Sequence, residues 1–219
     1  MMSEDGASRP DHEVISLDLF TPKAVRRRAL TVVIGAVIMG AAFGGIVGLI
    51  GGRVAGLIAA AVVGVPLVLL AWSESRRRVW LDDETVAVRA FGTRRVDLRQ
   101  VNRMELLITQ TRGSRTVGVL VAGPPKSKTI NLAVANYTGT VGNELGIVPL
   151  RRLANALAKS ENTNGLVYSE LLVAQLRAEA RGEPAEGRPL HQLAAAAPSG
   201  RLAQRIGQDA VVRFVSSLE

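Results

Sequence analysis

The chain has 219 residues, no cysteine and a formal net charge of +8 at pH 7. The absence of cysteine excludes disulfides, thiol catalysis and thiolate metal sites, and it fits a reducing cytoplasm. Hydrophobic residues make up 47% of the chain but aromatic residues only 4%, so the composition is unlike that of an aqueous core, which takes much of its buried area from aromatic rings.

Residues 1–28 are predicted to form a polar N-terminal segment. It opens with MMSEDGASRPDHE and ends in the basic triplet Arg26, Arg27 and Arg28. Within it, the short run VISLDLF has enough apolar side chains to rest on another surface.

Residues 29–72 form an apolar block in which Arg53 is the only charged residue. A membrane span needs about 20 apolar residues to cross about 30 Å of hydrocarbon, and residues 30–50 and 54–72 each have this length. The short link 51–53 forces two antiparallel neighbours. We therefore predict a transmembrane helical hairpin, in preference to a buried soluble hairpin or to a cleaved signal peptide, whose apolar region would be shorter and nearer the N-terminus.

Basic residues flank this block on both sides. Arg26, Arg27 and Arg28 precede it, and Arg76, Arg77 and Arg78 follow it. Cytoplasmic flanks of membrane spans carry an excess of lysine and arginine. We therefore expect a multi-pass protein of the plasma (inner) membrane with both termini in the cytoplasm.

Glycine recurs at every fourth position in this block, at residues 40, 44, 48, 52 and 56. In water each such glycine costs about 1 kcal/mol relative to alanine in a helix, but in lipid small residues allow helices to approach closely. We predict a helix-packing groove of Gly40, Gly44, Gly48 and Gly56. It serves either the hairpin's own second helix or a helix of another protein.

From residue 79 onward the pattern changes to short alternating segments. Val86 and Val88 alternate with polar or small residues, which predicts a half-buried strand, and a phase shift between Leu98 and Val101 predicts a bulge or bend. We expect turns at GTR and QTRGSR, a loop at NYTGTVGNELG, and a helix in VPLRRLANALAKS. Residues 76–159 are thus predicted to be five or six antiparallel strands in a small barrel or sandwich, closed by one helix.

The order of these elements resembles a known family. Two apolar helices, a basic triplet and then VWLDDETVAVRAFGTRRVDLRQVNRME are similar to the bacterial membrane proteins with a PH-like domain, over residues 29–159. The resemblance implies an α+β membrane protein in which an arginine-rich hairpin follows the entering strand and a C-terminal helix plugs one end of the barrel. It also implies a binding or scaffolding module rather than a catalyst.

Residues 160–219 exceed the family pattern and are predicted to form a helical C-terminal tail. GLVYSELLVAQLRAEAR has apolar Leu171 and Leu172, with Ser169 and Glu170 on the polar side; GEPAEGRP is a linker, and RLAQRIGQDAVVRFVSSL is a last helix. The tail either docks on its own domain, binds a partner or lies on the anionic inner leaflet.

No side chains in the sequence point to catalysis, a metal or a cofactor. His12 and His191 lack a histidine or cysteine partner at ligand spacing, and the adjacent acids Asp82, Asp83 and Glu84 are typical of a soluble turn. No phosphate-binding loop is present, and aromatic platforms that stack bases are missing. We expect a protein that is not an enzyme and that takes no cofactor, small-molecule substrate or nucleic acid.

Eight arginines are candidates for contact with anionic lipid: Arg26, Arg27, Arg28, Arg76, Arg77, Arg78, Arg94 and Arg95. Each cation near an anionic membrane surface gains about 1 kcal/mol. They either orient the domain against the membrane or form a site for a lipid headgroup or an anionic protein.

These features favour a non-catalytic accessory or scaffold subunit of a larger plasma-membrane complex, with integral membrane proteins as partners. The composition, rich in Ala, Val, Arg and Gly, is similar to that of high-GC actinobacteria. The size and layout resemble an accessory factor of the respiratory cytochrome bcc–aa3 supercomplex, and no haem, copper or quinone ligand is expected. The alternative is a membrane-anchored PH-like domain that binds anionic lipid headgroups, and an enzyme ranks last.

Overall fold

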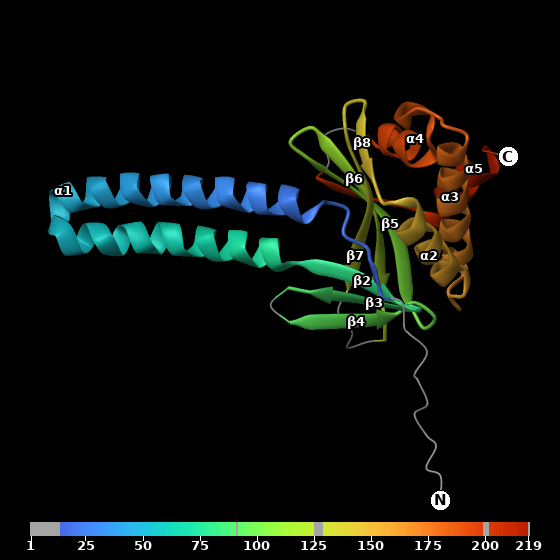
Figure 1. The fold of residues 1–219 in the computed structure, drawn as a ribbon, viewed down its shortest axis with the longest axis horizontal. Helices are drawn as coiled ribbons and strands as arrows, with labels where there is room; N and C mark the ends of the chain where they lie inside the picture. Colours follow the sequence, from blue (N-terminus) through green and yellow to red (C-terminus); the bar gives the residue numbers. More distant parts are fainter. Residues whose placement is uncertain (1–13, 91, 125–128, 199–201, 219) are drawn as a thin grey trace, which may run out of the picture. The chain divides into compact units, whose positions relative to one another are not determined.

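The protein is of the α+β class, with one long apolar N-terminal helix and two antiparallel sheets (Figure 1). The computed structural model describes residues 14–90, 92–124, 129–198 and 202–218. They divide into two compact units. One unit contains residues 20–78 and 89–92 and is mainly helix α1, and the other, here called the β unit, contains both sheets and the remaining helices.

Helix α1 spans Pro22–Arg76 and has one non-helical residue inside it, Gly52, with φ 82° and ψ 173°. Glycine adopts a positive φ without the steric cost that a Cβ atom brings. The predicted link, residues 51–53, contains this residue. In Figure 1 the blue and teal runs of α1 lie side by side on either side of the break.

The smaller sheet has the order β1-β2-β3-β4, with β1 at Ile15–Ser16, β2 at Arg78–Asp82, β3 at Thr85–Arg89 and β4 at Thr93–Asp97. Strand β1 pairs antiparallel with β2, and the next residue, Leu17, is buried. Within the segment 1–28, the run VISLDLF is expected to rest on another surface, and residues 15–17 do so. Its apolar side chains join a sheet edge and the core, and α1 starts before the arginine triplet. Residues 1–13, with His12, lie outside the described residues.

The larger sheet has the order β8-β7-β6-β5-β9. Its strands are β5 at Arg103–Thr111, β6 at Ser114–Ala122, β7 at Ile130–Thr138, β8 at Val141–Glu144 and β9 at Ala203–Ile206. Arg112 and Gly113 both have positive φ (49° and 77°) between β5 and β6, as a tight hairpin turn requires. The phase shift between Leu98 and Val101 marks the passage from one sheet to the other, and the register shift instead lies between Val117 and Gly118.

Two segments differ from their predicted conformation. Residues 136–146, predicted as a loop, contain the end of β7 and all of β8, with the reversal at Gly139 (φ 59°). Residues 203–206, predicted as the start of a helix, form β9, in which Ile206 pairs with Leu106 of β5. This pairing covers one edge of β5, which would otherwise present unpaired backbone groups.

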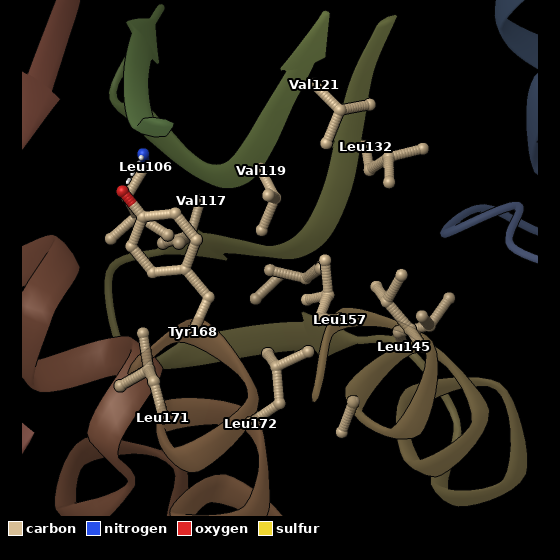
Figure 2. Close-up of a cluster of buried hydrophobic side chains, with 14 of the residues drawn as sticks. Leu106, Val117, Val119, Val121, Leu132, Leu145, Leu157, Tyr168, Leu171 and Leu172 are labelled. Carbon is tan, nitrogen blue, oxygen red and sulfur yellow. Dashed lines mark hydrogen bonds between the residues drawn. The ribbon is translucent and has the colours of Figure 1, made fainter. Parts of the chain in front are cut away.

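The C-terminal helices belong to the β unit and share its core. They are α2 (Ile147–Ala158), α3 (Thr163–Ala180), the 3₁₀ turn η1 (Ala185–Gly187), α4 (Pro189–Ala196) and α5 (Gln208–Ser216). Figure 2 shows Tyr168 and Leu172 of α3 against the strands, with the Tyr168 hydroxyl accepting a hydrogen bond from the Leu106 amide at 3.2 Å. The C-terminal tail therefore docks on its own domain, which is one of the three alternatives stated above.

A half-buried ion pair ties the predicted linker to the larger sheet. The Arg188 guanidinium donates to one Glu144 oxygen at 2.5 Å, and the Tyr137 hydroxyl donates to the other at 2.7 Å. Burial raises the pKa of Tyr137, and the hydrogen bond to the Glu144 carboxylate raises it further. Arg115 of β6 donates to the carbonyl oxygen of Ala194 at 2.7 Å, which satisfies an orphan group at the end of α4.

We predict that Arg188→Met destabilises the β unit by about 3 kcal/mol, because it leaves the Glu144 carboxylate buried without its cation. The side chain of Glu144 is only 9% exposed. The matched control is Arg181→Met, which breaks a pair with Glu183 in which the arginine is 63% exposed, and it should cost below about 1 kcal/mol. Urea unfolding followed by near-UV circular dichroism measures the free energy of unfolding of both variants. Equal decreases in the two variants would contradict the stabilising role of the Arg188–Glu144 pair.

Candidate functional site

The two halves of α1 touch through glycine. A Cβ atom built on Gly44 would lie 2.7 Å from the Ala60 Cβ atom and 2.7 Å from the Gly56 carbonyl oxygen. One built on Gly56 would lie 2.6 Å from the Gly44 carbonyl oxygen. Real Cβ atoms do not approach other atoms this closely, so only glycine allows these backbones to meet. A Cβ atom on Gly40 would lie 3.1 Å from the Ala60 carbonyl oxygen, which is also tight.

The order of these contacts shows that the halves run antiparallel. Gly40 faces Ala60 and Gly64, whereas Gly48, further along, faces Gly56. All four glycines predicted to pack therefore lie in one contact inside α1. By comparison, Gly45 would meet no atom within 4 Å if it carried a Cβ atom.

Between Leu30 and Trp72 the rest of the α1 surface is mainly apolar apart from Arg53, and much of it is exposed. Leu49 and Ile50 are 90% and 88% exposed, and large side chains from Leu30 to Trp72 are exposed along the whole element. Soluble monomers rarely expose an apolar patch beyond a few hundred Å². The stretch Lys23–Ser73 is long and apolar enough, by length and composition, to cross a membrane.

A shallow groove of 570 Å³ follows the line where the two halves of α1 meet. Its lining is apolar and includes Ala36, Gly40, Ala60, Gly64 and Leu69. It offers shape and apolar contact but no hydrogen-bonding side chain.

The predicted lipid-contacting arginines fall in both units. Arg26 and Arg27 are exposed in the first turns of α1, and at its other end Arg76 is exposed and lies over the Trp72 ring at 4.1 Å. Because the halves are antiparallel, the two basic flanks come to the same end of α1. Arg94 and Arg95 are exposed on β4, which belongs to the β unit.

The acidic turn at residues 82–84 is a structural link. Glu84 accepts from the Lys159 ammonium at 2.7 Å and pairs with the Arg99 guanidinium at 3.1 Å. These two cations lower the pKa of the Glu84 carboxyl, so the carboxylate ties the β2–β3 turn to the end of α2. Among the residues that the structure describes, no group of three or more His, Asp or Glu side chains is placed to hold a metal ion.

Helix α4 was missed by the sequence reasoning, and with it a cavity. His191 lies on α4 with its ring edge-on to Tyr137, at 4.9 Å between centroids. A cavity of 590 Å³ is lined by α3, α5 and the start of α4, and Ser169, predicted to lie on a polar face, is buried beside it. The available signal was Pro189 in front of the run LHQLAAAA, since proline favours the first position of a helix.

Comparison of the chain with models of known families, with curated proteins and with solved structures found no match.

We predict that Gly44→Leu separates the two halves of α1, because a side chain there collides with the facing backbone, at a cost of about 2 kcal/mol. The matched control is Gly45→Leu, which adds the same side chain where nothing lies within 4 Å. The chain has no cysteine, so a pair introduced as Ala36→Cys and Gly64→Cys reports the contact by its disulfide yield. The yield should fall several-fold with Gly44→Leu only, and equal yields in both variants would contradict the packing.

Proposed function

We propose that α1 is a transmembrane helical hairpin that anchors the protein in the plasma membrane. The observation that supports this most strongly is the run of exposed apolar side chains between Leu30 and Trp72. Water would make this surface aggregate, whereas acyl chains cover it at no cost. The arginines at one end of α1 favour the cytoplasmic side, so that both termini and the β unit lie in the cytoplasm.

On this anchor, we propose that the protein acts as a non-catalytic accessory or scaffold subunit of a larger membrane complex. The β unit resembles a PH-like module in layout, with strands followed by a helix that shares their core, and such modules bind. Since the glycine contact is occupied within α1, partner helices would meet its outer faces, including the 570 Å³ groove. The particular complex that we propose, from size and layout, is the actinobacterial cytochrome bcc–aa3 supercomplex.

We predict that labelling of single cysteines, introduced into the otherwise cysteine-free chain, reports this orientation. A membrane-impermeant maleimide should modify Arg53→Cys in intact cells, because the link between the spans lies outside. Thr138→Cys, exposed in the β unit, should react only after lysis. Both variants should react equally in detergent, which controls for accessibility. Labelling of Thr138→Cys in intact cells would rule out a cytoplasmic β unit.

A second candidate function is the binding of anionic lipid headgroups by the β unit. Arg94 and Arg95 are consecutive and both exposed on the edge strand β4. Two adjacent cations on an edge offer an anionic surface about 1 kcal/mol each. The two candidate functions predict different molecules bound to the purified protein: a protein partner for the subunit function and anionic phospholipid for the second candidate.

We predict that the protein, extracted in mild detergent, co-purifies with an integral membrane partner at a fixed stoichiometry. The subunit proposal would be contradicted by a preparation of this 23.2 kDa chain alone that retains anionic phospholipid. The double variant Arg94→Gln with Arg95→Gln should keep the partner if the subunit proposal holds and lose the lipid if the second candidate holds. Arg151→Gln with Arg213→Gln removes two exposed cations elsewhere on the β unit and serves as the control.

A further inference from the structure

The cavity beside α3 has the size of a small-molecule site and a lining that combines charged and apolar side chains. Its 590 Å³ falls within the range of about 300–1,000 Å³ that is usual for such sites. Val173, Val215 and Leu218 supply apolar wall from two helices and the chain end, and the polar residues Ser169, Glu170 and Arg177 line it from α3. All of it lies within the β unit.

Ser169 gives the cavity an unused hydrogen-bonding group. The residue is only 7% exposed, and its hydroxyl makes no hydrogen bond to another residue in the described part of the chain. A serine hydroxyl that lines a cavity can both donate a hydrogen bond to a ligand and accept one from it. The signal is independent of the shape of the cavity.

The charges along the cavity are of both signs and stand apart. Arg181 and Glu183 pair with each other at 2.7 Å, but within the described residues Glu170 and Arg177 have no ion-pair partner. They are seven residues apart on α3, which is about 10 Å along a helix axis. The lining therefore presents a carboxylate at one end, a guanidinium at the other and apolar wall between them.

We propose that this cavity binds a short apolar zwitterion, of the class of apolar tripeptides. An extended tripeptide spans about 10 Å, so its ammonium group reaches Glu170 while its carboxylate reaches Arg177. Its apolar side chains lie against Val173 and Val215, and Ser169 pairs with its backbone. A fatty acid would leave Glu170 unused, and a small inorganic anion would leave the apolar wall uncovered.

The test is calorimetric titration of the full chain in mild detergent with trivaline, N-acetyl-trivaline and trivaline amide. Trivaline should bind in a 1:1 ratio, and removal of either terminal charge should weaken binding about fivefold, as expected for a solvent-accessible ion pair. In Arg177→Gln, trivaline should bind no more tightly than trivaline amide. In Glu170→Gln, trivaline should bind no more tightly than N-acetyl-trivaline. Ser169→Ala should weaken the binding of all three peptides.

The matched control is Arg151→Gln, an exposed charge on α2 outside the cavity, which should bind all three peptides as the parent chain does. Circular dichroism establishes that each variant is folded. The proposal is overturned if none of the three peptides shows saturable binding at millimolar concentration, or if Arg177→Gln and Glu170→Gln leave the ranking of the peptides unchanged.

Discussion

Direct contact between two stretches of helical backbone organises α1. At Gly44 and Gly56 there is no room for a Cβ atom, so the halves meet at the closest distance that a polypeptide allows. Dispersion between backbones falls steeply with distance, which makes this contact effective without any polar partner. Because it sets the two halves antiparallel, it also gathers the basic flanks at one end and leaves the large apolar side chains pointing outward.

In the β unit, unlike α1, the apolar faces of the sheets are shielded from water. Val86, Val96 and Leu106 come from both sheets, and they share one core with α2 and α3. The chain after residue 160 is part of this solution, since Tyr168 and Leu172 complete the core and β9 extends the larger sheet. Polar contacts then fix each added piece, such as the Asn162 side chain, which accepts from the Asn164 amide at the start of α3 and donates to the Val101 carbonyl oxygen at 3.1 Å.

The sequence predicted features that depend on local periodicity and missed those that depend on distant partners. The long apolar element, the strand around Val86 and Val88, and the helix after Gly146 follow from neighbouring residues, and each is present. The strand is not half-buried as predicted, because Ala87 between the two valines is buried as well. Strand β9 forms because Leu106, about a hundred residues earlier, offers it an edge, and its own residues AQRI give no clear signal. Ser169 lies on the predicted polar side of α3, but α4 and α5 pack beside that side and bury it, which helical periodicity alone does not reveal.

The low aromatic content has a consequence for the β unit as well as for α1. Its core is built almost wholly from valine, leucine, isoleucine and alanine, and among the described residues the buried aromatic ones are Tyr137 and Tyr168. Burial raises the pKa of both phenols, and each hydroxyl makes a hydrogen bond, to the Glu144 carboxylate and with the Leu106 amide. Each tyrosine therefore fills core volume and makes a directed bond: Tyr168 ties α3 to β5, and Tyr137 of β7 bonds to Glu144 of β8, which pairs with Arg188. In a core of small aliphatic side chains that have no directional preference of their own, these bonds and the Arg188–Glu144 pair are what select one arrangement of the helices over its alternatives.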